Sequence, residues 1–71
     1  MTDSRFLAAL GTKIKKLRLK KNMTQNDLAV QCKFEKASMS RIESGKTNVT
    51  ILTLKKISAV LETDIHKFLK S

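Results

Sequence analysis

The most informative part of this sequence is residues 24–45, TQNDLAVQCKFEKASMSRIESG. It opens with Thr24 and, three positions later, Asp27. This is the spacing of a capping box, in which two side chains bond to free N–H groups at the start of a helix. The stretch therefore predicts a short helix from Gln25 to Cys32.

A second short helix is predicted from Lys36 to Ser44, after a tight turn at residues 33–35. Gly45 then stands where helices commonly end in a left-handed residue. Two helices that cross steeply over so short a turn need a small residue at the crossing, and Ala29 supplies it. With the apolar residues facing inward, the outer face of the second helix is short, cationic and polar, as the DNA major groove requires. It carries Lys36, Ala37, Ser40 and Arg41.

The rest of the chain is also expected to be helical, because it lacks proline and its apolar residues recur every three or four positions. Asp3 or Ser4 would cap a first helix that ends at Asn22. Thr50 would cap a fourth helix, and Asp64 a short fifth one. The predicted fold class is all-α, a compact bundle of five helices.

The composition of the 71 residues favours a polyanionic partner. Lys and Arg number 15 against 6 Asp and Glu, a formal net charge of +9, which suits nucleic acid or an anionic membrane. This length predicts one domain, residues 1–71, without room for a large enclosed active site. We expect a cytoplasmic protein, because the sequence shows neither a signal-peptide pattern nor an apolar run of about 18 residues.

Cys32 and His66 are the single cysteine and the single histidine. They are too few for an intramolecular disulfide or a zinc site, so neither a metal nor a cofactor is expected. We interpret Cys32 as a buried apolar residue and His66 as a surface residue. No set of nucleophile, base and orienting acid is recognisable, and an enzyme is the least favoured class.

Taken together, these features resemble the helix-turn-helix regulators of the Cro and lambda-repressor type, also called the XRE family. The matching residues are Gly11, Ile14, Leu17, Arg18, Thr24, Gln25, Leu28, Ala29, Ser40, Arg41, Ile42, Glu43, Gly45, Lys46 and the helix from Leu54 to Leu61. The resemblance implies a five-helix, lambda-repressor-like DNA-binding domain with its helix-turn-helix at about residues 24–44. It also implies that the helix Lys36–Ser44 is the recognition helix.

The resemblance further implies a division of roles. Arg18 and Glu43 stand at family positions that form an ion pair inside the fold. Arg41 is the best candidate to read guanine, because its planar fork matches two acceptors of that base. The expected base-reading residues are Lys36, Ala37, Ser40 and Arg41, and the expected phosphate-binding residues are Thr24, Gln25, Ser38, Lys46, Thr47 and Asn48.

Two positions depart from the family pattern. Lys33 replaces the usual glycine, and a left-handed conformation there costs roughly 1 kcal/mol. Glu35 replaces the usual serine or threonine. It can still cap the third helix, but a carboxylate beside phosphates weakens binding unless it accepts a hydrogen bond from a cytosine amino group.

The C-terminal segment is more apolar than a small bundle needs, which favours a homodimer interface at Leu61, Ile65, Phe68 and Leu69. The alternative is that Phe68 folds back over the first helix. A dimer would bind a near-palindromic operator whose half-sites lie about 34 Å apart.

The leading hypothesis is a sequence-specific, double-stranded DNA-binding transcriptional regulator whose activity depends on its concentration, its dimerisation or a second protein regulator. One alternative is an antitoxin-type interaction protein that also autoregulates its operon. Another is a basic amphipathic protein for RNA or membranes. RNA is disfavoured because the chain lacks an aromatic platform, and membranes because the bundle needs the apolar face of the first helix.

Overall fold

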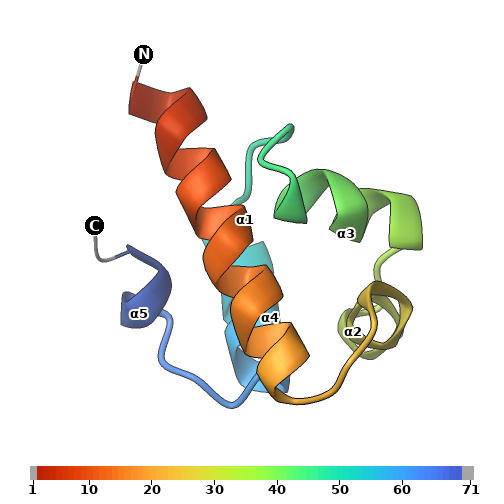
Figure 1. Cartoon of the computed structure of the whole chain (residues 1–71). Helices are drawn as coiled ribbons and strands as arrows, with labels where there is room; N and C mark the ends of the chain where they lie inside the picture. Colours follow the sequence, from red (N-terminus) through yellow and green to blue (C-terminus); the bar gives the residue numbers. More distant parts are fainter. Residues whose placement is uncertain (1, 70–71) are drawn as a thin grey trace.

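The computed structural model describes residues 2–69 and, within them, the side chains from Ser4 onward. This part of the chain contains five helices and no strand, as Figure 1 shows. The predicted all-α fold class is confirmed. The helices are α1 (Thr2–Lys20), α2 (Gln25–Cys32), α3 (Lys36–Glu43), α4 (Ile51–Val60) and α5 (His66–Leu69).

Helix α1 packs against α3 on one side and α5 on the other. In Figure 1, α2 and α3 lie on one side of α1 and α4, and α5 lies on the other side. Helix α3 packs against both α1 and α2, α2 also packs against α4, and α5 packs against α1. The core takes residues from all five helices and from the residue that follows α4: Leu10, Ile14, Leu28, Ala29, Cys32, Met39, Ile42, Leu54, Ile57, Leu61 and Phe68.

The predicted capping box at the start of α2 is present. The Thr24 hydroxyl accepts a hydrogen bond from the Asp27 N–H at 3.0 Å, and the Asp27 carboxylate accepts one from the Thr24 N–H at 2.9 Å. The N–H and then the hydroxyl of Thr24 lower the pKa of the Asp27 carboxyl. The ionised Asp27 carboxylate therefore stabilises the fold fully at pH values above the ordinary pKa of aspartate. This contribution is lost as the pH falls through the lowered pKa.

Replacing Thr24 with alanine removes the hydroxyl that accepts from the Asp27 N–H. We expect the free energy of unfolding in urea to fall by about 0.5–2 kcal/mol. Thr12→Ala is the matched control, because the Thr12 hydroxyl is exposed and bonds only to the Ala8 carbonyl within α1. It should change stability by no more than about 0.5 kcal/mol. Equal effects of the two variants would contradict the capping role.

Other predicted helix ends are confirmed in part. Thr50 caps α4 by accepting from the Thr53 N–H at 3.1 Å, and Asp64 accepts from the His66 N–H at 3.0 Å, just before α5. The prediction that Asp3 or Ser4 caps the first helix is wrong, because α1 begins at Thr2 and both residues lie inside it.

The start and end of α3 also differ from the expectation. The Glu35 side chain makes no capping hydrogen bond, so the prediction that it caps this helix is wrong. At the other end, α3 stops at Glu43, and Ser44 is the residue that follows the last helical turn.

Lys33 adopts the left-handed conformation that the family resemblance implied, with φ of 62°. Its backbone N–H reaches the carbonyl oxygens of Ala29 and Val30, and the Phe34 N–H donates to the Ala29 oxygen at 2.8 Å. These bonds close the end of α2 and hold the three-residue turn, so the lysine is tolerated where glycine is usual.

The four residues predicted for a dimer interface do not share one exposed face. Leu61 and Phe68 are each 1% exposed and belong to the core of the protomer, which corrects the prediction for these two. Phe68 folds back against α1, as the alternative held, because α5 packs on that helix. Ile65 is half-buried, and Leu69 is 41% exposed.

Candidate nucleic-acid interface

Helix α3 presents two distinct faces. Met39 and Ile42 point into the core, with 0% and 6% of their surface exposed. Because 3.6 residues complete a turn, the opposite face is built by positions 36, 37, 40 and 41. All four predicted base-reading residues on that face are exposed: Lys36, Ala37, Ser40 and Arg41. The face combines two cations, a hydroxyl and a methyl group, which are the groups that contact base edges in a major groove.

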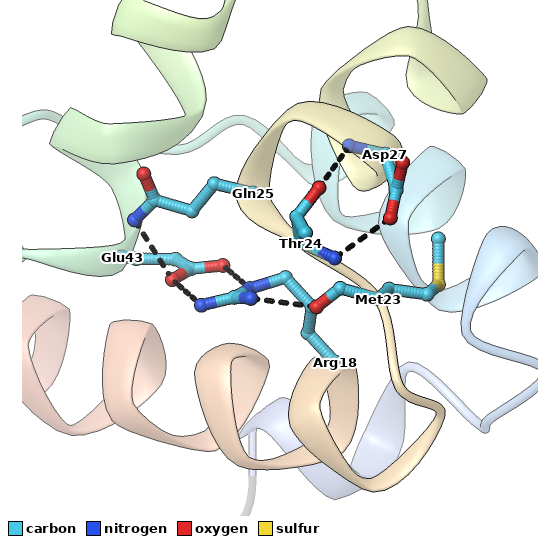
Figure 2. A network of polar contacts seen from close by, with 6 residues as sticks. All are labelled: Arg18, Met23, Thr24, Gln25, Asp27 and Glu43. Atoms are coloured by element: carbon cyan, nitrogen blue, oxygen red, sulfur yellow. Dashed lines mark hydrogen bonds and ion pairs between the residues drawn. The ribbon is translucent and has the colours of Figure 1, made fainter.

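A buried polar network fixes α3 to α1, as Figure 2 shows. The Arg18 guanidinium donates from Nε to Glu43 Oε2 at 2.7 Å and from Nη2 to Glu43 Oε1 at 3.0 Å. Its Nη1 donates to the Met23 carbonyl at 2.7 Å. The predicted ion pair is therefore present in the bidentate form, and it is almost fully buried, with Arg18 6% and Glu43 8% exposed.

Gln25 joins this network, which the sequence did not reveal. Its Nε2 donates to Glu43 Oε1 at 3.1 Å. An ionised carboxylate can only accept, so the amide nitrogen must face Glu43, and the amide oxygen points away from it in Figure 2. The side chain predicted to hold a phosphate is thus oriented by the last residue of α3, and no local spacing rule connects positions 25 and 43.

A surface hollow at the start of α2 brings several predicted site residues together. Its lining includes Thr24, Gln25, Asn26 and Lys36, with Arg18 behind them. The first N–H groups of a helix and its positive dipole end favour an anion, and Lys36 adds a full positive charge. This surface therefore has the chemistry of a phosphate site beside the exposed face of α3.

The loop after α3 is held by the Schellman pattern of helix ends. The Lys46 N–H donates to the Arg41 carbonyl at 3.0 Å, and the Gly45 N–H donates to the Ile42 carbonyl at 3.2 Å. Gly45 has the left-handed φ of 74° that this pattern needs. Lys46 and Asn48 are exposed and Thr47 is half-buried, so these predicted phosphate ligands follow directly from the end of α3.

A helix-turn-helix family model matches residues 14–68 of the chain. The chain belongs to this helix-turn-helix family. It is 44% identical over 52 residues to the control protein C.MunI of Mycoplasma sp, a match that covers 72% of this chain and 70% of C.MunI.

The fold of this helix-turn-helix protein is similar to those of solved regulator structures. The wild-type restriction-modification controller protein C.Esp1396I is 38% identical, with a TM-score of 0.81 over 90% of this chain and 82% of the other. SinR, the master regulator for biofilm formation, was solved in complex with DNA. It is 35% identical, with a TM-score of 0.80 over 86% of this chain and 98% of that one.

Two remaining candidates in the helix-turn-helix protein are placed as expected. Cys32 is 3% exposed, and burial raises the pKa of its thiol, while His66 is exposed on α5. Among the described side chains, which begin at Ser4 and end at Leu69, no group of three or more His, Cys, Asp or Glu could hold a metal ion. In the same part of the chain, no helix combines the length and apolar character needed to cross a membrane.

Proposed function

We propose that this helix-turn-helix protein is a sequence-specific, double-stranded DNA-binding transcriptional regulator that inserts α3 into the major groove. The observation that carries the proposal is the exposed face of α3, held against α1 by the buried pair of Arg18 and Glu43. A rigidly held helix with cations at both ends of one face can present them to base edges in a defined register. The relatives named above are regulators, so the antitoxin-type alternative is not favoured.

The predicted site residues divide into two proposed groups by the part of DNA that they would contact. Lys36, Ala37, Ser40 and Arg41 would read bases, and Arg41 would pair with a guanine. Phosphates would be bound at the start of α2 and in the loop after α3, by Thr24, Gln25, Ser38, Lys46, Thr47 and Asn48. The lysines of α1 would add a general attraction to the duplex.

We propose that the regulator acts as a homodimer on a near-palindromic operator. One eight-residue helix spans few base pairs, so two copies are needed to define a site. Of the four apolar residues first considered, Ile65 and Leu69 remain available for the contact, because Leu61 and Phe68 are in the core. Residues 1–71 would form one domain that acts in the cytoplasm. The concentration of the protein, or a second protein, would set its activity.

The test compares Arg41→Ala with Lys46→Ala on duplexes selected from a random pool. Arg41→Ala should weaken binding to the selected site by about 1–3 kcal/mol and relax the preference at one base pair. Lys46→Ala should weaken binding to all duplexes alike and lower the slope of log affinity against log salt by about one. Fluorescence anisotropy at several salt concentrations measures both quantities.

Lys16→Ala is the matched control for these two variants. Lys16 is exposed, and it lies on the opposite side of α1 from Arg18, which faces α3. Removing it should change affinity less than Lys46→Ala does and leave base preference intact. If Arg41→Ala kept the base preference of the wild type, the assignment of α3 as the reading helix would be wrong.

A further inference from the structure

Glu35 is an acidic residue at the leading end of α3 whose carboxylate the fold does not bind. The side chain is exposed, and the backbone is extended, with φ of −73° and ψ of 149°. It makes no capping hydrogen bond, and the ion pairs Arg18–Glu43 and Lys21–Glu62, seen among the described side chains, do not include it. A hydrogen bond that caps the helix would be the ordinary structural role of a side chain at this position, and Glu35 does not make one.

The position of Glu35 places it among the residues that meet DNA. Recognition helices contact base edges with their N-terminal residues, and Glu35 directly precedes Lys36 at that end. Figure 1 shows the yellow-green start of α3 at the outer edge of the molecule, with its other end near α1. When α3 enters a major groove, Glu35 enters it at the same end of the helix as Lys36.

The chemistry of a carboxylate then limits what it can contact. An ionised carboxylate only accepts hydrogen bonds, and phosphates repel it. In the major groove, guanine and thymine offer acceptors, and the donors are the amino groups of cytosine and adenine. Adenine presents its amino group beside the N7 acceptor, an arrangement that suits an amide, whereas the cytosine N4 amino group suits a carboxylate.

We propose that Glu35 is a specificity-determining residue that accepts a hydrogen bond from the N4 amino group of a cytosine in each half-site. This inference rests on the proposed function of α3. The negative charge at the start of α3 would then select between bases. The carboxylate attracts the cytosine amino group and disfavours every base that offers only acceptors. The half-site should accordingly require a C·G pair close to the base pair that Lys36 contacts.

The experiment selects duplexes from a random pool with the wild type, Glu35→Gln and Glu35→Ala. It then measures the affinity of each protein for the selected site with all four base pairs at the cytosine position. The wild type should prefer cytosine about tenfold over the other bases. Glu35→Gln, which keeps the shape of the side chain, should shift the preference to adenine. Glu35→Ala should abolish the preference at this position and leave it intact at the others.

Glu62→Gln is the matched control, because it removes one exposed negative charge at the end of α4, where the carboxylate pairs with Lys21. It should leave the selected sequence unchanged. Thermal unfolding of Glu35→Gln, Glu35→Ala and Glu62→Gln distinguishes a loss of base recognition from a loss of the favourable interaction between a carboxylate and the α3 dipole. The second effect would lower stability without altering base preference.

Two results would overturn the inference, and they are distinguishable. If Glu35→Ala bound every duplex more tightly by the same factor and selected the same sequence as the wild type, the carboxylate would only repel phosphates, and the proposed function would stand. If the wild type selected no sequence at all, the proposed function would fail together with the inference.

Discussion

Replacing Glu43 with alanine should lower the free energy of unfolding by about 3–5 kcal/mol, because it leaves the Arg18 guanidinium buried without its carboxylate. Two of the three hydrogen bonds of the Arg18 guanidinium are lost, and only its bond to the Met23 carbonyl remains. Small domains are stable by about 5–15 kcal/mol, so a substantial part of the total disappears. Urea unfolding followed by circular dichroism measures the loss.

The other ion pair of the described residues is the control for Glu43→Ala. Lys21 Nζ lies 2.7 Å from Glu62 Oε1, as close as the buried pair, but on the surface. Breaking it with Lys21→Ala should have a small effect, because water solvates the carboxylate that remains. Similar losses in the two variants would show that burial does not set the strength of the Arg18–Glu43 link.

A double replacement, Arg18→Met with Glu43→Leu, separates stability from function. Removing both charges leaves no buried ion, so this variant should be far more stable than Glu43→Ala. It nevertheless removes the acceptor that orients the Gln25 amide. We therefore expect the double variant to fold and to bind DNA more weakly than the wild type.

Gly11→Ala should destabilise the protein by about 1–3 kcal/mol or more, although alanine is the better helix former. A Cβ atom at Gly11 would lie 2.3 Å from the carbonyl oxygen of Glu43 and 2.7 Å from that of Ile42. Both are backbone atoms of α3, so no side chain can rotate away, and α1 and α3 must separate. Thermal unfolding gives the change in stability.

The same substitution should also weaken DNA binding. Gly11 and Arg18 are seven residues apart and therefore share one face of α1, so a wider gap at Gly11 also strains the bond to Glu43 and moves α3. Ala9→Gly, at an exposed position of the same helix, is the control and should lose only about 0.5–1 kcal/mol from helix propensity. A stabilised Gly11→Ala variant would refute the close approach of α1 and α3.

The sequence showed Gly11 as a residue that matches the family, but it did not show why glycine is required at this position. Local sequence rules describe what a residue does to its own helix, and there glycine is unfavourable. The benefit lies in the contact with Ile42 and Glu43 of α3, which are more than 30 positions further along the chain. Only the crossing of the two helices shows why a side chain cannot be accommodated.

Features that rest on interactions between neighbouring residues could be predicted before the fold was known. The capping box of Thr24 and Asp27 and the exposed face of α3 follow from spacings of three or four residues. The left-handed Lys33 was implied by the family resemblance, which places glycine at this position. Hydrogen bonds across one helical turn, and the 3.6-residue period that sorts inward from outward positions, act on neighbouring residues. They can therefore be predicted without knowing how the helices are arranged.

Contacts between distant segments became evident only from the packing of the helices. The bond of Gln25 to Glu43 joins positions 18 residues apart, and no periodicity relates them. Phe68 could cover α1 or face a second copy, and its burial depends on the angle at which α5 returns. The sequence also allowed Glu35 to cap α3, but in the fold its side chain is exposed and makes no capping hydrogen bond. These outcomes depend on how whole helices pack, which is a property of the assembled core and not of any one stretch of the chain.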